Sequence, residues 1–146
     1  MTTVGTLCYI IKHGKVLLIQ KKRGLGKGLW NGPGGKVNDA ESIEDAASRE
    51  VFEEIDIAPD GLMKMGEIEF YMGQENDADW VVHVFVADDY DGIEKETKEA
   101  VPKWFSLSKI PYDEMWPDDR IWLPLVLGGK KFRGKFYLDR GGKSVI

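Results

Sequence analysis

The stretch "GGKVNDAESIEDAASREVFEEIDI", residues 34–57, decides the fold of this chain. It begins with two glycines and continues with acidic side chains that recur at helical spacing. We predict a helix from about Ser42 to Glu54. Ser42 is a suitable N-cap, and Glu44 and Asp45 fall in the first turn, where the helix dipole favours negative charge. The glycines before the helix predict a loop whose backbone takes unusual angles or approaches another group closely.

One face of the predicted helix carries three carboxylates. Because each residue turns by roughly 100 degrees, Glu53 and Glu54 fall within about 60 degrees on either side of Glu50. The opposite arc holds the side chains that we expect to pack on a sheet, namely Val51, Phe52 and Ile55. Like charges at these spacings destabilise a helix unless something neutralises them. Two interpretations follow: a solvated acidic face, or a site for Mg²⁺ or Mn²⁺, which prefer oxygen ligands.

The rest of the chain is predicted to form strands and a second helix around one core. Two apolar runs, 6–11 and 15–20, predict a hairpin with Gly14 in its turn. Further strands are expected at 64–73, 79–89, 101–107 and 130–139, and a short helix is expected within 116–129. In the second of these strands, Val82, Val84 and Val86 share one face. This order predicts an α+β domain, a mixed sheet with helices packed on it, that spans residues 1–146.

Composition narrows the class of protein. The chain has 146 residues, 42% of them hydrophobic and 31% charged, as in soluble globular domains. No apolar run approaches the roughly 20 residues of a membrane span, and the N-terminus does not resemble a signal peptide. Cys8 is expected to be a buried thiol in a reducing cytoplasm. The net charge of −5 argues against a nucleic-acid polymer as partner, and a polyphosphate substrate would need a locally bound cation.

The spacing inside residues 35–57 separates the two interpretations of the acidic face. It resembles the Nudix box, G-x5-E-x7-R-E-U-x-E-E-x-G-U, in which U is aliphatic. The matching residues are Gly35, Glu41, Arg49, Glu50, Val51, Glu53, Glu54 and Ile57. Asp56 stands where the pattern has glycine, just past the helix, where a left-handed residue is common. The length of the match favours a metal site over a solvated face.

By that resemblance, the chain adopts the Nudix fold, with the box as a loop–helix–loop, and cleaves a nucleoside diphosphate linked to another group. The implied metal ligands are the Gly35 carbonyl, Glu50, Glu53, Glu54 and Glu99. Mg²⁺ is the implied cofactor, with Mn²⁺ as a substitute, and it would neutralise the phosphates and activate an in-line water. Arg49 would orient the glutamates, Glu41 would support the loop, and Glu54 or Glu99 would accept the proton of the water.

A narrower resemblance covers about residues 16–137. The segments 21–37, 82–88, 104–127 and 130–136 resemble the oxidised purine nucleoside triphosphate diphosphatases of the MutT-homologue type. In that subfamily an asparagine and two adjacent aspartates hold the base, here Asn31, Asp118 and Asp119. Trp116 would stack on the purine. Lys21 and Thr6 match further pocket positions.

The chemistry of an aspartate pair fits this role. Burial and mutual repulsion raise the pKa of one member, so that a shared proton lets the pair present both a donor and acceptors to a purine edge. An aromatic face adds about 1–3 kcal/mol per stacked base. An alternative is that Asp118 and Asp119 form only the first turn of a helix after Pro117, where the helix dipole favours them.

Several positions depart from the subfamily or carry simpler expectations. Leu25 and Pro33 replace aromatic residues in the glycine loop, and Trp80 replaces methionine, so we expect a different pocket wall and a different ranking of bases. His83 is expected to be a histidine of a strand face and not a ligand. The basic segment 130–136 is expected to form an edge strand, which its charges would protect from pairing.

The sequence therefore predicts Mg²⁺-dependent hydrolysis of an (oxidised) purine nucleoside triphosphate, such as 8-oxo-dGTP or 2-hydroxy-dATP, to the monophosphate and pyrophosphate. The substrate is a small molecule, and the protein is expected to be a monomer or weak dimer. One alternative is a Nudix hydrolase of ADP-ribose or a dinucleotide. Another is a nucleotide-binding module without catalysis, which the complete set of box glutamates disfavours.

Overall fold

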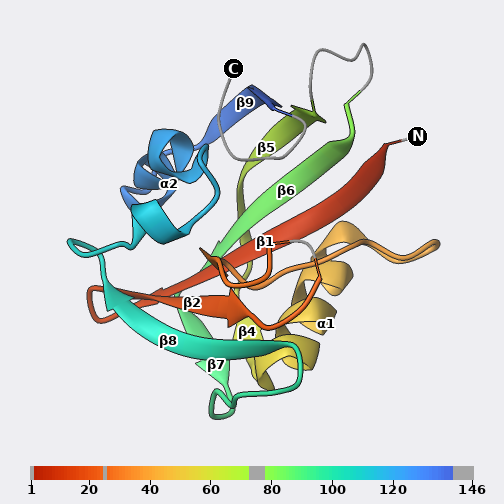
Figure 1. Ribbon diagram of the computed structural model, residues 1–146. Helices are drawn as coiled ribbons and strands as arrows, with labels where there is room; N and C mark the ends of the chain where they lie inside the picture. Colours follow the sequence, from red (N-terminus) through yellow and green to blue (C-terminus); the bar gives the residue numbers. More distant parts are fainter. Residues whose placement is uncertain (1, 25, 73–77, 140–146) are drawn as a thin grey trace.

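The computed structural model describes residues 2–24, 26–72 and 78–139 and shows a mixed sheet with a helix on each face (Figure 1). The strands are β1 (Thr3–Lys12), β2 (Lys15–Lys21), β3 (Trp30–Asn31), β4 (Ala58–Asp60), β5 (Met63–Met72), β6 (Trp80–Ala87), β7 (Asp89–Asp91), β8 (Ala100–Ser106) and β9 (Phe132–Leu138). The helices are α1 (Ile43–Ile55), the 3₁₀ turn η1 (Tyr112–Glu114) and α2 (Asp119–Leu127). The short strands β3, β4 and β7 were not predicted.

Seven strands form the main sheet. Its order is β3-β2-β1-β6-β5-β9, and β8 pairs with β2, while β4 and β7 form a separate ribbon. The pairs β1–β6 and β5–β9 are parallel and the other pairs are antiparallel, which confirms the predicted mixed sheet. His13 and Gly14 both have positive φ in the two-residue turn between β1 and β2, as a type I′ hairpin requires. The basic strand β9 lies at an edge, as expected.

Alternating side chains divide the core between the two faces of the sheet. On β2, Leu17 and Ile19 pack with α1, whereas Val16 and Leu18 pack in the cluster that includes α2. The predicted valine face of β6 belongs to the α2 side. Cys8 is fully buried on the α1 side, where burial raises the pKa of its thiol to about 12, so the predicted burial of this thiol is confirmed.

The ends of α1 follow the predicted signals. The Ser42 hydroxyl accepts a hydrogen bond from the Asp45 N–H, and Asp56 ends the helix in the left-handed region, with φ 63°. Phe52 was expected to pack on the sheet, and this expectation is wrong, because its exposed fraction is 56%. The buried face of α1 runs instead through Ala47, Val51 and Ile55 and includes Glu54.

The sheet opens between β1 and β2, and the glycine loop fills the opening. Strand β2 leaves β1 after Leu17 and continues beside β3. The vacated edge of β1 pairs with the loop: the N–H groups of Thr6 and Cys8 donate to the carbonyls of Gly35 and Pro33, at 2.8 Å each. A Cβ on Gly34 would lie 1.9 Å from the Thr6 carbonyl oxygen, so only glycine allows this close approach.

Candidate active site

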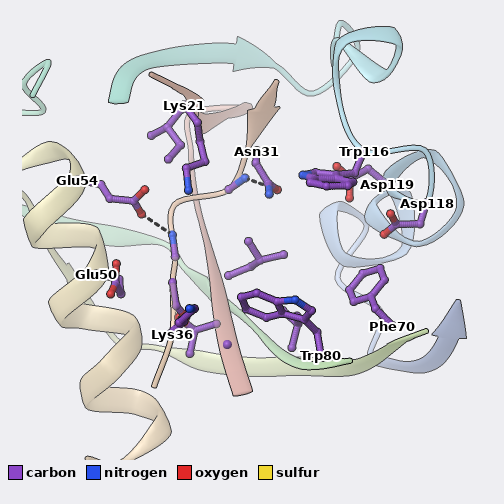
Figure 2. Close-up of a pocket in the computed structure, with 18 of the residues that line it drawn as sticks. Lys21, Asn31, Lys36, Glu50, Glu54, Phe70, Trp80, Trp116, Asp118 and Asp119 are labelled. Carbon is purple, nitrogen blue, oxygen red and sulfur yellow. Dashed lines mark hydrogen bonds between the residues drawn. The ribbon is translucent and has the colours of Figure 1, made fainter. Parts of the chain in front are cut away.

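A cavity of about 930 Å³ lies where the sheet opens, and it extends from α1 to the start of α2 (Figure 2). Figure 2 shows Glu50 and Glu54 at one end, Asp118 and Asp119 at the other, and Asn31 between them. Every residue that the sequence placed in the site lines this cavity except Arg49. These residues are Thr6, Lys21, Asn31, Gly35, Glu50, Glu53, Glu54, Glu99, Trp116, Asp118 and Asp119.

Arg49 lies behind the acidic end and holds it in place. Its guanidinium donates to Glu41 at 2.7 and 3.0 Å, to Glu50 at 2.8 Å and to Glu53 at 3.1 Å. It also donates to the Lys36 carbonyl at 2.9 Å, which ties the helix to the loop. Planar, bidentate contacts of this kind need arginine. The predicted orienting role of Arg49 and the predicted supporting role of Glu41 both agree with this geometry.

The three box glutamates differ sharply in exposure. Glu54 is 5% exposed, the Glu50 side chain 18% and the Glu53 side chain 53%. The Gly34 N–H donates to Glu54 Oε1 at 2.7 Å, a contact that is drawn in Figure 2. The Glu50 carboxyl lies directly against Gly35, where a Cβ would be 2.3 Å from its carboxyl carbon. Gly34 and Gly35 therefore leave space for the close approach of strand β1 and of the Glu50 carboxyl.

Burial sets the proton affinity of these acids. Desolvation raises the pKa of Glu54 to about 8 in the metal-free protein, against the lowering effect of the Gly34 hydrogen bond, and the charge of Glu50 adds to the increase. Desolvation also raises the pKa of Glu50, and its contacts with Arg49 oppose the shift. Glu99 differs, because its ion pair with Arg23 lowers its pKa.

The donor set at this end suits a hard divalent cation. Among the described residues, no three acidic, histidine or cysteine side chains already converge as a metal cage. The reason is visible in the contacts: Glu50 and Glu53 turn toward Arg49, and Glu54 turns toward Gly34. All three carboxylates nevertheless line one cavity together with Glu99, and such oxygens are the ligands that Mg²⁺ prefers. The residues therefore fit a cation by chemistry and placement.

The other end of the cavity holds a buried acid pair. Asp118 and Asp119 are 1% and 2% exposed at the N-terminus of α2. The Trp122 indole donates to Asp118 Oδ2 at 2.6 Å, and no group of the described residues donates to Asp118 Oδ1 or Asp119 Oδ2. Desolvation raises the pKa of both groups, and the charge of Asp118 raises that of Asp119 further. Asp118 is the N-cap of α2 and Asp119 is its first residue, as the alternative of a helix start after Pro117 expected, and Asp118 makes no side-chain capping hydrogen bond.

The predicted pocket departures have mixed outcomes. Trp80 lines the cavity, and its ring lies over Gly5, whose Cβ would be 3.0 Å from the indole. Pro33 is buried and is not among the described residues that line the cavity. Leu25 lies outside the described residues. His83 is buried on its strand, with Nδ1 3.5 Å from Glu67, as expected of a strand-face histidine.

Sequence reasoning missed several residues around the acid pair. Two residues were not predicted to belong to the site: Trp122, which donates to Asp118, and Tyr9, which is fully buried beside Asn31. Further unpredicted lining residues are Gly5, Leu7, Phe70, Met72 and Leu138. The i+4 spacing of Asp118 and Trp122 on a helix was the one available signal. The others come from strands far apart in the chain.

Comparisons with known proteins show relatives over most of the chain. The NUDIX domain family matches residues 1–126. The chain is 48% identical to the oxidized purine nucleoside triphosphate hydrolase of Danio rerio, over 97% of this chain and 88% of that protein. It is 47% identical to the protein of the same name from Mus musculus, over 90% of this chain and 83% of that protein.

A solved structure agrees at the level of the fold. The MutT protein of Bacillus halodurans superposes with a TM-score of 0.87 at 26% identity, over 99% of this chain and 94% of that one. None of the described helices is long and apolar enough to cross a membrane. The box geometry, the matched family and these relatives lead to one conclusion: this chain belongs to the Nudix family of hydrolases.

Proposed function

We propose that the protein hydrolyses purine nucleoside triphosphates, oxidised ones above all, to the monophosphate and pyrophosphate. The observation that carries this proposal is one cavity with two acidic ends of opposite character, one suited to a cation and one suited to a shared proton. The names of the Danio rerio and Mus musculus relatives support the same substrate class.

The acidic end at α1 would bind Mg²⁺, with Mn²⁺ as a substitute, since Nudix hydrolases generally need divalent cations. The proposed ligands are the Gly35 carbonyl, Glu50, Glu53, Glu54 and Glu99. A bound cation supplies charge neutralisation of the phosphates and lowers the pKa of water. The Gly35 carbonyl accepts the Thr6 N–H at 2.8 Å and the Thr6 hydroxyl at 3.4 Å, so a bound cation would take the place of the longer hydroxyl contact.

Glu54 is the better candidate for the proton acceptor. The reaction forms a bond between water oxygen and phosphorus and breaks a phosphoanhydride bond, so one proton must leave the water. In the metal-free protein burial raises the pKa of Glu54 to about 8, whereas the ion pair with Arg23 lowers that of Glu99, so Glu54 has the higher proton affinity of the two. The Gly34 N–H contacts Oε1 of Glu54, which leaves Oε2 to face the cation or the water.

The base would bind at the α2 end. Two buried oxygens, Asp118 Oδ1 and Asp119 Oδ2, have no hydrogen-bond donor within the described part of the chain, and a purine edge could supply donors. The raised pKa of both groups favours keeping one proton on the pair. Trp116 offers an aromatic face along the same wall, which is worth about 1–3 kcal/mol for a stacked base.

The test is a substrate panel with product analysis. Protein with Mg²⁺ is incubated with 8-oxo-dGTP, 2-hydroxy-dATP, dGTP, dATP and ADP-ribose, and the products are resolved. We expect pyrophosphate and the oxidised monophosphate, with kcat/KM well above that for dGTP and dATP. Two monophosphates from ADP-ribose as the preferred reaction would replace this proposal with another Nudix activity. Binding of all compounds without turnover would indicate a module that does not catalyse.

A further inference from the structure

A buried tyrosine lies behind the wall of the base-binding end. Tyr9 on β1 is 0% exposed and is not one of the described residues that line the cavity. Its ring packs against the glycine loop at Gly32, where a Cβ would lie 2.7 Å from the Cε1 atom of Tyr9. It also meets Trp122 edge to face, at 6.0 Å between ring centroids. Tyr9 thus contacts the elements that carry Asn31 and Asp118.

The hydroxyl of Tyr9 acts on the amide of Asn31. Asn31 Oδ1 accepts the Gly32 N–H at 2.8 Å and the Tyr9 hydroxyl at 3.5 Å. A backbone N–H can only donate, so the oxygen of the amide must face these two groups. The Nδ2 donors of Asn31 are then left to face a ligand in the cavity. Burial and the charges of Asp119 and Asp118 raise the pKa of Tyr9, which keeps its proton in place for donation.

We propose that Tyr9 is a positioning residue for base recognition, whose hydroxyl and ring hold Asn31 so that its amide presents donors to an acceptor on the base. This inference rests on the proposed function. The acceptor would complement the donors that Asp118 and Asp119 require, so the base edge must carry both kinds of group. Tyr9 itself does not touch the substrate. A tyrosine that only fills the core would influence stability and leave the orientation of Asn31 unchanged.

The test uses Tyr9→Phe, which removes the hydroxyl and keeps the ring. Kinetics are measured on 8-oxo-dGTP for the wild type, Tyr9→Phe, Asn31→Ala and the double variant. Loss of one neutral hydrogen bond predicts a KM about 3- to 10-fold higher for Tyr9→Phe, with kcat within about twofold. In the Asn31→Ala background, removal of the hydroxyl should have no further effect, because the group through which it acts is gone.

Tyr71→Phe is the matched control. Tyr71 is also buried and its hydroxyl donates to Glu69 at 3.2 Å, but it does not line the cavity. We expect this variant to have wild-type kinetics. A fall in melting temperature with unchanged KM in Tyr9→Phe, or an equal effect with and without Asn31, would overturn the positioning role.

A readout without substrate separates this inference from the proposed function. In a ¹⁵N-labelled protein, the side-chain NH₂ signals of Asn31 report the environment of the amide. Tyr9→Phe should shift or broaden these signals, and Tyr71→Phe should leave them unchanged. Unchanged Asn31 signals in Tyr9→Phe would overturn the inference about Tyr9. Failure of the wild type to hydrolyse purine triphosphates would instead overturn the proposed function.

Discussion

The two acidic ends of the cavity use the same chemical group in opposite ways. At α1, Glu50 and Glu53 contact Arg49, and the three box glutamates range from buried to exposed. At α2, Asp118 and Asp119 are both buried, and no Lys, Arg or His of the described chain forms an ion pair with either. At the first end burial raises the pKa of Glu50 and Glu54, but Arg49 opposes the shift of Glu50. At the second end no cation of the described chain opposes the effect of burial, which favours the neutral form of an acid.

This difference shows how one cavity can separate chemistry from recognition. A carboxylate beside cations or water stays ionised and can bind a metal, while a desolvated pair retains a proton and can donate as well as accept. The two acidic ends must lie apart for these roles to stay separate. The sheet keeps them apart, because α1 and α2 lie on its opposite faces and approach the opening from different sides (Figure 1). Substitutions at the α1 end should therefore lower the rate of hydrolysis, whereas substitutions at the α2 end should weaken recognition of the base.

The largest effect is expected for Glu54→Gln. The amide keeps the shape and can still accept the Gly34 N–H, but it cannot take a proton from water. We expect kcat to fall about 10³-fold, a typical effect of losing a general base. Steady-state kinetics at saturating Mg²⁺ measure it, with Glu44→Gln on the exposed first turn of α1 as the control. Activity near that of the wild type would move the proton acceptor to Glu99.

Asp118→Asn should weaken recognition of the base and leave the rate of the hydrolysis step nearly unchanged. The amide oxygen can keep the contact with Trp122, while the exchange of a carboxyl for an amide breaks the pattern offered to the base. We expect kcat/KM on 8-oxo-dGTP to fall about 10- to 100-fold, mainly through KM. The fall on dGTP should be smaller. Equal losses on both substrates would assign Asp118 to the general architecture of the pocket.

Arg49→Lys tests whether the arrangement of the glutamates at the α1 end depends on the contacts that Arg49 makes. Lysine keeps the charge but cannot contact Glu41, Glu50 and Glu53 at the same time. Loss of these charged hydrogen bonds should cost about 1–3 kcal/mol of folding free energy and lower kcat/KM about tenfold. Calorimetric unfolding and kinetics together measure both effects. Arg120→Lys, at an exposed ion pair with Asp113, should change neither quantity.

Trp80→Met should change the ranking of bases more than the rate. Trp80 lines the cavity over Gly5, and a smaller, more flexible side chain there alters the wall without touching either acidic end. We expect the ratio of kcat/KM for 8-oxo-dGTP to that for 2-hydroxy-dATP to change by about fivefold. A competition assay with both substrates measures the ratio. An unchanged ratio would show that the acid pair alone sets the preference.

The smallest effect is a pH dependence of stability in the substrate-free protein. Burial raises the pKa of Asp119 in the folded state, so the unfolded state loses this proton first as pH rises from about 4. The folded protein therefore loses stability through that range, up to the raised pKa. Asp119→Asn should weaken this dependence, to which the raised pKa values of Asp118, Glu50 and Glu54 also contribute, and raise Tm near pH 7.5 by about 3 °C for each kcal/mol relieved. Equal Tm differences at pH 4 and 7.5, measured by calorimetry, would contradict this account.

Much of the α1 end followed from sequence because its parts are local. The i, i+3 and i+4 spacing of Glu50, Glu53 and Glu54, the Ser42 cap and the left-handed Asp56 all depend on neighbours within one helix. The helical phase also produced one error: Phe52 lies beyond the edge of the buried arc, and Glu54 lies inside it. Which part of a helix is buried depends on the sheet beneath it, and the helix alone does not specify that.

The sequence by itself determined the elements, the box and the identities of the acids at both ends of the cavity, since these rest on local spacing and on a long motif. Only the tertiary structure decided that β2 leaves β1, that Gly34 and Gly35 enter the gap, and that Tyr9 supports Asn31 from below. It also decided the proton affinity of the acids at the two ends of the cavity. Proton affinity depends on desolvation by distant segments, and sequence spacing does not encode that contact.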